Sequence, residues 1–196
     1  MVNYPNKKKV KITSSLRGTK HYTAHRGMNL EDEISQSNEY YLIHDLAVIY
    51  KKPTPIQIVK VDYPARSAAK IVEAYYRQPS TTDYNGIYKG RYVDFEAKET
   101  KVNSFPFKNI SLHQIEHLQR IIDHGGIAFL IIAFTTVNEV YLIDASYIIE
   151  DYYHGPKKSM KYEKIKTLGH LVKQGYQPRF DYLKVIDSYY LKEEHS

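Results

Sequence analysis

The chain has 196 residues, 42% of them hydrophobic, and a formal net charge of +6. This length and hydrophobic content suit one domain with a substantial core. The absence of cysteine excludes disulfides and thiolate metal sites and fits a reducing cytoplasm. Residues 1–7 contain no apolar core of a signal peptide, and the longest apolar stretch, 126–134, is too short to span a bilayer. We therefore expect a cytoplasmic protein without a membrane partner.

Residues 1–25 are expected to form a basic, flexible N-terminal arm. The first 30 residues contain seven lysines and arginines and no acid, so the remaining 166 residues sum to a charge of −1. Few aliphatic side chains and many Ser, Thr, Asn and Gly favour a mobile segment. A basic arm binds phosphates by releasing counterions, which predicts a nucleic-acid partner. The alternatives are a solubilising tail or contact with an anionic membrane, although the arm lacks the apolar face of an interfacial helix.

Residues 26–196 are predicted to form a single domain of alternating helices and strands. Hydrophobic periodicity and the positions of Gly and Pro mark the boundaries. One predicted apolar stripe consists of Leu112, Ile115, Leu118 and Ile122. The expected elements are a helix from Asn29 to about His44, strands at 46–50 and 56–61, a short helix at 67–76, a hairpin at 81–100, a helix at 111–123, strands at 127–134 and 139–143, and helices near 146–153, 160–173 and 181–191.

A basic segment lies between the strand at 46–50 and the hairpin. It has six lysines and arginines against two acids, Asp62 and Glu73. Basic residues interleaved with tyrosines suit a surface that binds phosphates and stacks on exposed bases. In the alternative, the tyrosines pack against the body and the charges merely face water. The candidate DNA-binding residues are Lys51, Arg66, Lys70, Tyr75 and Tyr76.

The predicted hairpin can bring acidic side chains together. If Lys89 and Gly90 form its two-residue loop, Asp83 lies opposite Glu96, and Thr81 lies opposite Lys98. Alternation then puts Asp83 and Glu96 on matching faces of the two strands, together with Asp94 and Lys98. Such a cluster of carboxylates with one ammonium can hold a divalent metal and stabilise charge on a phosphate.

Two alternatives to this arrangement remain open. Asn85-Gly86 is a stronger two-residue turn signal than Lys89-Gly90, and as the turn it would place Asp83 opposite Tyr88. A bulge at Gly86 within the longer hairpin would reconcile the two. Charged residues that alternate with apolar ones are also typical of any half-exposed antiparallel strand.

The helix after the hairpin carries two further candidate motifs. Its His113-Gln114-Ile115-Glu116-His117 run matches the inverted zinc-peptidase motif, but no third ligand is evident. Ser111 and Gln114 are spaced as a capping box. Gln114 could instead present its carbonyl to a metal or its amide to a phosphate near the helix N-terminus, which favours anions.

Several segments together resemble the RecU family of Holliday junction resolvases of Gram-positive bacteria and mollicutes. They are Arg26–Met28, Lys51–Val59, Tyr63-Pro64, Arg66-Ser67, Ser80–Gly86, Asp94–Lys101 and His113–His117. The resemblance implies an α/β fold of the restriction-endonuclease-like PD-(D/E)xK superfamily. Its mixed central sheet would be flanked by helices, and a stalk of about residues 51–80 would protrude.

The resemblance also implies catalytic roles. Residues matching Thr81, Asp83, Glu96 and Gln114 surround Mg²⁺, for which Mn²⁺ can substitute, and the residue matching Lys98 stabilises the transition state. The expected catalytic residues are therefore Asp83, Glu96 and Lys98. The superfamily's usual Pro-Asp pair is Thr82-Asp83 in this sequence. The resemblance leaves the role of Asp94 open.

The expected function is cleavage of branched DNA. The resemblance implies a symmetric homodimer that binds four-way junctions and makes paired symmetric nicks during homologous recombination and DNA repair. RecA recombinase is a further expected partner, and the protein would be nucleoid-associated when it acts on DNA. One alternative is a non-catalytic branched-DNA-binding or recombinase-modulating protein. Another is a restriction-type nuclease that prefers linear duplex.

Overall fold

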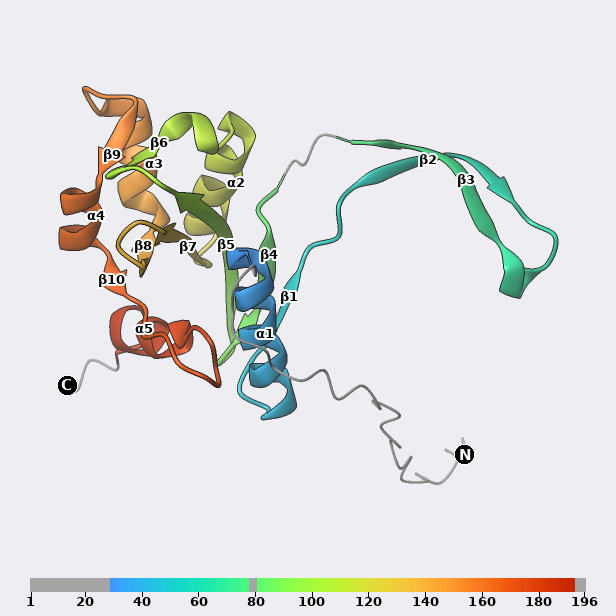
Figure 1. Cartoon of the computed structure of the whole chain (residues 1–196), viewed down its shortest axis with the longest axis horizontal. Coiled ribbons are helices and arrows are strands. Elements are labelled where there is room, and N and C mark those ends of the chain that lie inside the picture. The colour runs from blue at the N-terminus through green and yellow to red at the C-terminus, as the bar shows by residue number, and fades with distance from the viewer. Residues whose placement is uncertain (1–28, 78–80, 193–196) are drawn as a thin grey trace, which may run out of the picture.

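The protein, described here from a computed structural model over residues 29–77 and 81–192, is built on a six-stranded mixed sheet (Figure 1). Neighbouring strands pair antiparallel except β5 and β7, which are parallel. A parallel pair needs a long crossover connection, and α2 lies in that crossover. In spatial order the strands are β1 (Val48–Lys51), β4 (Tyr84–Tyr88), β5 (Arg91–Thr100), β7 (Ile127–Phe134), β8 (Glu139–Asp144) and β10 (His170–Leu171).

Helices cover both faces of the sheet. They are α1 (Leu30–Ile43), α2 (Leu112–Asp123), α3 (Ala145–His154), α4 (Tyr162–Leu168) and α5 (Tyr182–Tyr189). A second small sheet pairs β6 (Ser104–Pro106) with β9 (Ser159–Lys161), and a short 3₁₀ turn, η2 (Phe107–Asn109), precedes α2. These observations confirm the predicted α/β class with a mixed central sheet between helices.

The sheet separates two hydrophobic cores, and β5 contributes to only one of them. Val93, Phe95 and Ala97 of β5 pack into the core beneath α1 and α5. The other core is formed by α2, α3 and α4 against β7 and β8, and no β5 residue belongs to it. Because strand side chains alternate between faces, Asp94 and Glu96 lie on the α2 side, where the buried residues of β5 are polar instead of apolar.

Helix α1 begins and ends as the sequence predicts. The side chain of Asn29 accepts a hydrogen bond from the amide of Asp32 at 2.8 Å, which satisfies a free N–H of the first turn. Tyr41 on its buried face donates its hydroxyl proton to the carbonyl of Phe180 at 2.6 Å. This contact ties the helix to the C-terminal segment that leads into α5.

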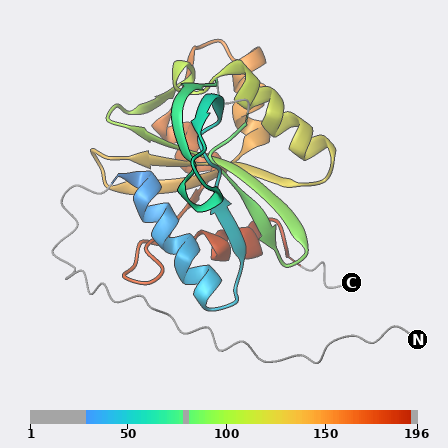
Figure 2. The same ribbon diagram turned by 90° about the vertical axis from the view of Figure 1, so that its right-hand side faces the viewer.

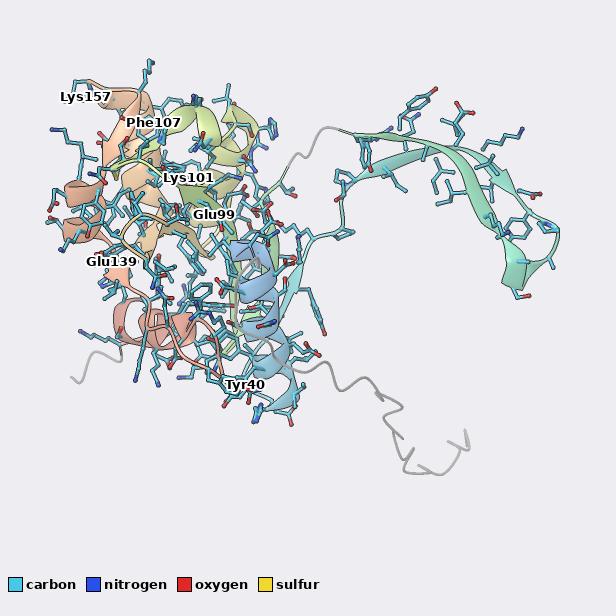
Figure 3. The ribbon with its side chains drawn as sticks, viewed as in Figure 1. Tyr40, Glu99, Lys101, Phe107, Glu139 and Lys157 are labelled. Atoms are coloured by element: carbon cyan, nitrogen blue, oxygen red, sulfur yellow. The ribbon has the colours of Figure 1, made fainter. Side chains whose placement is uncertain are left out.

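A two-stranded ribbon, β2 (Ile56–Asp62) and β3 (Lys70–Tyr76), protrudes from the body between β1 and β4 (Figures 1 and 2). Every residue of both strands is exposed. Side chains fill the space between sheet and helices in the body, whereas those of the ribbon project into solvent (Figure 3). The ribbon provides the protruding stalk that the resemblance implied, and we refer to residues 53–81 as the stalk segment.

The helix predicted at 67–76 is wrong. Only η1 (Arg66–Ala68), a 3₁₀ turn at the tip, is helical, and the rest is β3. An isolated helix of this length is marginal in water without an apolar surface to pack against, and the stalk lies away from the body. Pairing with β2 satisfies the backbone groups instead, and the β-branched and aromatic residues of β3 favour a strand.

Three smaller predictions also need correction. The helix predicted at 160–173 is interrupted: β9 precedes α4, and after Gly169 the chain pairs with β8 as β10. Leu112 is exposed at the first position of α2, although Ile115 and Leu118 are buried as expected. The first predicted strand lies at 48–51 rather than 46–50. The predicted arm of residues 1–25 lies outside the described residues.

Candidate active site

The β4–β5 hairpin closes at Lys89 and Gly90. Both residues have positive φ, 45° and 75°, as a two-residue turn between twisted strands requires. Tyr88 pairs with Arg91, and the register continues without a bulge. The alternative turn at Asn85-Gly86 is therefore wrong, because both residues lie inside β4. Gly86 is needed there for another reason: a Cβ would lie 2.0 Å from the carbonyl oxygen of Val48 in β1.

This register brings Asp83 to Glu96 as predicted. The backbone N–H of Asp83 donates to Glu96 Oε2 at 3.1 Å. In return, Asp83 Oδ2 accepts a hydrogen bond from the backbone N–H of Ala97 at 3.2 Å. The carboxylates therefore lie side by side at the point where the chain returns from the stalk into β4.

Glu96 is fully buried and is contacted from three directions. Besides Asp83, its carboxylate accepts hydrogen bonds from the Lys98 ammonium and from Gln114 Nε2, the latter at 2.7 Å. Burial raises the pKa of Glu96 to about 7; Lys98 opposes this shift, and the neighbouring charge of Asp83 reinforces it. A cation placed between the two acids would relieve both the burial of charge and the repulsion.

Gln114 forms the predicted capping box, and its amide nitrogen contacts Glu96. Its Oε1 accepts from the backbone N–H of Ser111 at 3.0 Å, which completes the capping box of α2. Its Nε2 donates a hydrogen bond to Glu96, so the amide nitrogen contacts the acidic pair while the amide oxygen caps the helix. Thr81 lies two residues before Asp83 and is half-buried.

A second cluster, which the sequence did not predict, surrounds Asp94. This fully buried carboxylate accepts from Lys52 Nζ at 2.7 Å, from the Tyr92 hydroxyl at 2.9 Å and from the Thr82 hydroxyl, and it contacts His117 Nε2 at 3.3 Å. Burial alone would raise the pKa of Asp94, but hydrogen bonds from His117, Lys52 and Thr82 together lower it. Alternation placed Asp94 on this face, but no local pattern indicated its partners.

The two histidines of the zinc-like motif have different partners. His113 Nε2 lies 3.0 Å from Ser111 Oγ, whereas His117 contacts Asp94. Within residues 29–77 and 81–192, no three His, Asp or Glu side chains lie close enough to hold a metal by themselves. The residues that could hold a metal at the hairpin are the neighbouring acids Asp83 and Glu96. This set fits Mg²⁺, which is commonly bound through one or two carboxylates and keeps several waters.

The predicted DNA-binding residues are divided between the stalk and its root. Lys70, Tyr75 and Tyr76 are exposed on β3, with 61% of Tyr75 and 85% of Tyr76 accessible, so these tyrosines do not pack against the body. Lys51 ends β1 and forms an ion pair with Glu31 at 2.5 Å. Arg66 lies in the turn at the stalk tip, and its side chain is outside the described part of the structure.

The mixed sheet with helices on both faces carries Asp83 beside Glu96 and Lys98 on one hairpin, which is the arrangement that the resemblance to restriction-endonuclease-like nucleases implied. Comparison with known families then identifies the group: the chain belongs to the RecU family, because the family model described as Recombination protein U matches residues 25–188.

Curated relatives resemble the chain over nearly its whole length. Proteins named Holliday junction resolvase RecU from Bacillus thuringiensis (strain Al Hakam), Bacillus cereus (strain AH820) and Bacillus anthracis (strain CDC 684 / NRRL 3495) are each 54% identical to it. Each alignment covers 96% of this chain and 98% of the relative. Among solved structures, Archaeoglobus fulgidus Hjc, a Holliday junction resolvase from an archaeal hyperthermophile, is 14% identical. It matches with a TM-score of 0.40 over 68% of this chain and 93% of its own.

Proposed function

We propose that the chain is a Mg²⁺-dependent, structure-specific endonuclease that resolves Holliday junctions by paired symmetric nicks during recombination and repair. The observation that carries this proposal is the convergence of Asp83, Glu96 and Lys98 at the root of the protruding stalk. Membership of the RecU family and relatives named Holliday junction resolvases support the substrate.

Asp83 and Glu96 would hold the metal, with Thr81 and Gln114 orienting or completing its surroundings. A bound Mg²⁺ supplies Lewis-acid activation of the scissile phosphate and of the attacking water. Mn²⁺ would substitute because it accepts the same oxygen donors. The buried position of Glu96 beside Asp83 favours a cation there, since the two carboxylates otherwise repel each other.

Lys98 would stabilise the charge that develops on the phosphoryl oxygens. Its ammonium contacts Glu96 and stays partly exposed, so it can reach a phosphate held beside that acid. An ammonium placed where negative charge develops lowers the barrier more than it strengthens binding.

The stalk would recognise the branch point of the junction. Tyr75 and Tyr76 offer exposed rings for stacking on unpaired bases, and Lys70 offers a charge to a phosphate. We propose that Arg66 at the tip and Lys51 at the root contribute further phosphate contacts.

We propose that the protein acts as a homodimer through the open face of β1, β4 and β5. Val48, Ile87 and Tyr92 lie opposite one another across these three strands, and each is exposed. With Tyr50 they form an apolar surface at a sheet edge, the kind of surface that proteins normally cover. A two-fold dimer would present two identical sites, as matched nicks in two strands require.

The family resemblance also carries two broader proposals. The chain would modulate the RecA recombinase, and it would work in the cytoplasm at the nucleoid. In the described part of the chain, no helix is long and apolar enough to cross a membrane.

The decisive experiment compares cleavage of a mobile four-way junction with that of a matched linear duplex, with and without Mg²⁺. Wild type, Asp83→Ala and the control Glu150→Ala, an exposed acid on α3, would be assayed together. Paired symmetric nicks that require both Mg²⁺ and Asp83 are expected. Tight junction binding without nicking under any divalent metal would instead indicate a non-catalytic branched-DNA or recombinase-modulating protein. Preferential nicking of the duplex would indicate a restriction-type nuclease.

A further inference from the structure

Asp94 on β5 contacts residues at both ends of the stalk segment. Lys52 immediately follows β1, where the chain leaves the body, and Thr82 precedes Asp83, where the chain returns. Both side chains donate to the same carboxylate, from residues 42 and 12 positions away in the sequence. We call Lys52, Thr82 and Asp94 the stalk-root clasp.

Both carboxylate oxygens of Asp94 already have side-chain hydrogen-bond partners. Its Oδ1 accepts from Thr82, and its Oδ2 faces Lys52, Tyr92 and His117. Three of these partners lie on Oδ2 and one on Oδ1. Asp94 thus contacts residues at both ends of the stalk segment, whereas Asp83 and Glu96 contact each other.

The clasp residues lie next to the backbone hydrogen bonds that position Asp83. The Lys52 N–H donates to the Asp83 carbonyl at 2.7 Å, and the Asp83 N–H donates to Glu96. The Lys52 side chain additionally donates to Thr82 Oγ1 at 2.8 Å. The peptide units on both sides of the Asp83 side chain are thus held, one by Lys52 and the other by Glu96, while Asp94 holds the residues next to them.

We propose that Asp94 is a positioning residue: through Lys52 and Thr82 it locks the root of the stalk to β5 and so sets Asp83 against Glu96. The stalk and the acidic pair then form one rigid unit. DNA whose branch point is bound by the stalk would then lie at a fixed distance from Asp83 and Glu96. Loss of the clasp would therefore slow cleavage without weakening binding of the junction. This inference rests on the proposed nuclease function.

Thr82 offers the sharpest test, because one substitution removes the hydroxyl that forms the clasp and another keeps it. Thr82→Val keeps the shape of this buried side chain but removes its hydroxyl, whereas Thr82→Ser keeps the hydroxyl. In single-turnover cleavage of the four-way junction we expect Thr82→Val to be about 10- to 100-fold slower, since small misplacements of reacting groups have large effects on rate. Thr82→Ser should cleave within about 3-fold of wild type, and both should bind the junction within about 2-fold of it.

A double substitution tests whether the residues act as a unit. Thr82→Val combined with Asp94→Asn should cleave no more slowly than Asp94→Asn alone, because interacting residues are not additive. Thermal unfolding of each variant shows whether it is folded; if Thr82→Val is not, Lys52→Met, at a partly exposed position, replaces it. A wild-type cleavage rate in Thr82→Val would refute the proposed role of the clasp. A double variant whose loss in cleavage rate equals the product of the two single losses would refute it as well.

The same assay separates this inference from the proposed function. Wild type that makes no Mg²⁺-dependent, Asp83-dependent nicks would refute the nuclease itself. Wild type that nicks normally, together with Thr82→Val and Lys52→Met variants that match it, would refute only the positioning role of Asp94.

Discussion

The backbone N–H of Asp83 donates a hydrogen bond to Glu96 Oε2 at 3.1 Å, so a hydrogen bond within the hairpin links the two acidic residues. The contact links the return of the stalk segment to a fully buried position of β5. It keeps the two acidic residues next to each other, and the charge of Asp83 adds to the burial that raises the pKa of Glu96.

Glu96→Gln should separate stability from activity. The amide keeps the shape and one of the two acceptor oxygens, and it removes a buried negative charge next to Asp83. We expect cleavage to fall at least about 100-fold, while the metal-free protein unfolds at the same temperature or ~2–4 °C higher. Thermal unfolding in chelator and single-turnover cleavage in Mg²⁺ measure the two effects. A variant that is both markedly unstable and inactive would contradict this reading of the buried acid.

Lys98→Ala should slow cleavage far more than it weakens binding. Loss of one group that stabilises developing charge typically reduces the rate about 10²- to 10³-fold. The dissociation constant for the junction should change by less than ~3-fold, because a single phosphate contact contributes little to a large interface. Lys192→Ala, an exposed lysine near the C-terminus, serves as the control. Equal losses of binding and cleavage would argue against a transition-state role for Lys98.

Tyr76→Ala should weaken junction binding without affecting stability. The ring is 85% exposed on the stalk, so its removal leaves the core unchanged. If it stacks on a base, binding should lose about 1–3 kcal/mol, and Tyr76→Phe should restore it. Fluorescence anisotropy with four-way and linear DNA measures the selectivity, with Tyr153→Ala on α3 as the control. Undiminished junction affinity in Tyr76→Ala would exclude stacking by this residue.

Ile87→Asp should convert a dimer into monomers. Ile87 is 57% exposed at the centre of the apolar face formed with Val48 and Tyr92, and a buried unpaired carboxylate there would be costly. The matched control is Leu171→Asp, since Leu171 is 59% exposed on β10 at the opposite edge of the sheet. Sedimentation velocity reports the mass of each variant. Dissociation by Leu171→Asp alone would place the interface at the other edge.

The local sequence predicted the features that depend on backbone conformation and on the alternation of side chains along a strand. Positive φ at Lys89 and Gly90 closes the hairpin, and period-two alternation then carries Asp83 to Glu96. The N-cap at Asn29 and the capping box at Ser111 are also local. The continuous apolar run of β7 predicted a central strand, and all eight of its residues are buried.

Contacts between distant segments were decided only by the tertiary structure. The region 67–76 is compatible with helix or strand, and pairing with β2 selected the strand. Lys52 and His117 meet Asp94 from 42 and 23 residues away, across the stalk segment and the β5–α2 connection. Periodicity encodes which face a side chain occupies, but not which remote donor lies opposite it. The sequence by itself therefore determined that Asp83 meets Glu96, and the tertiary structure decided that a residue immediately after β1 and a residue of α2 contact the neighbouring Asp94.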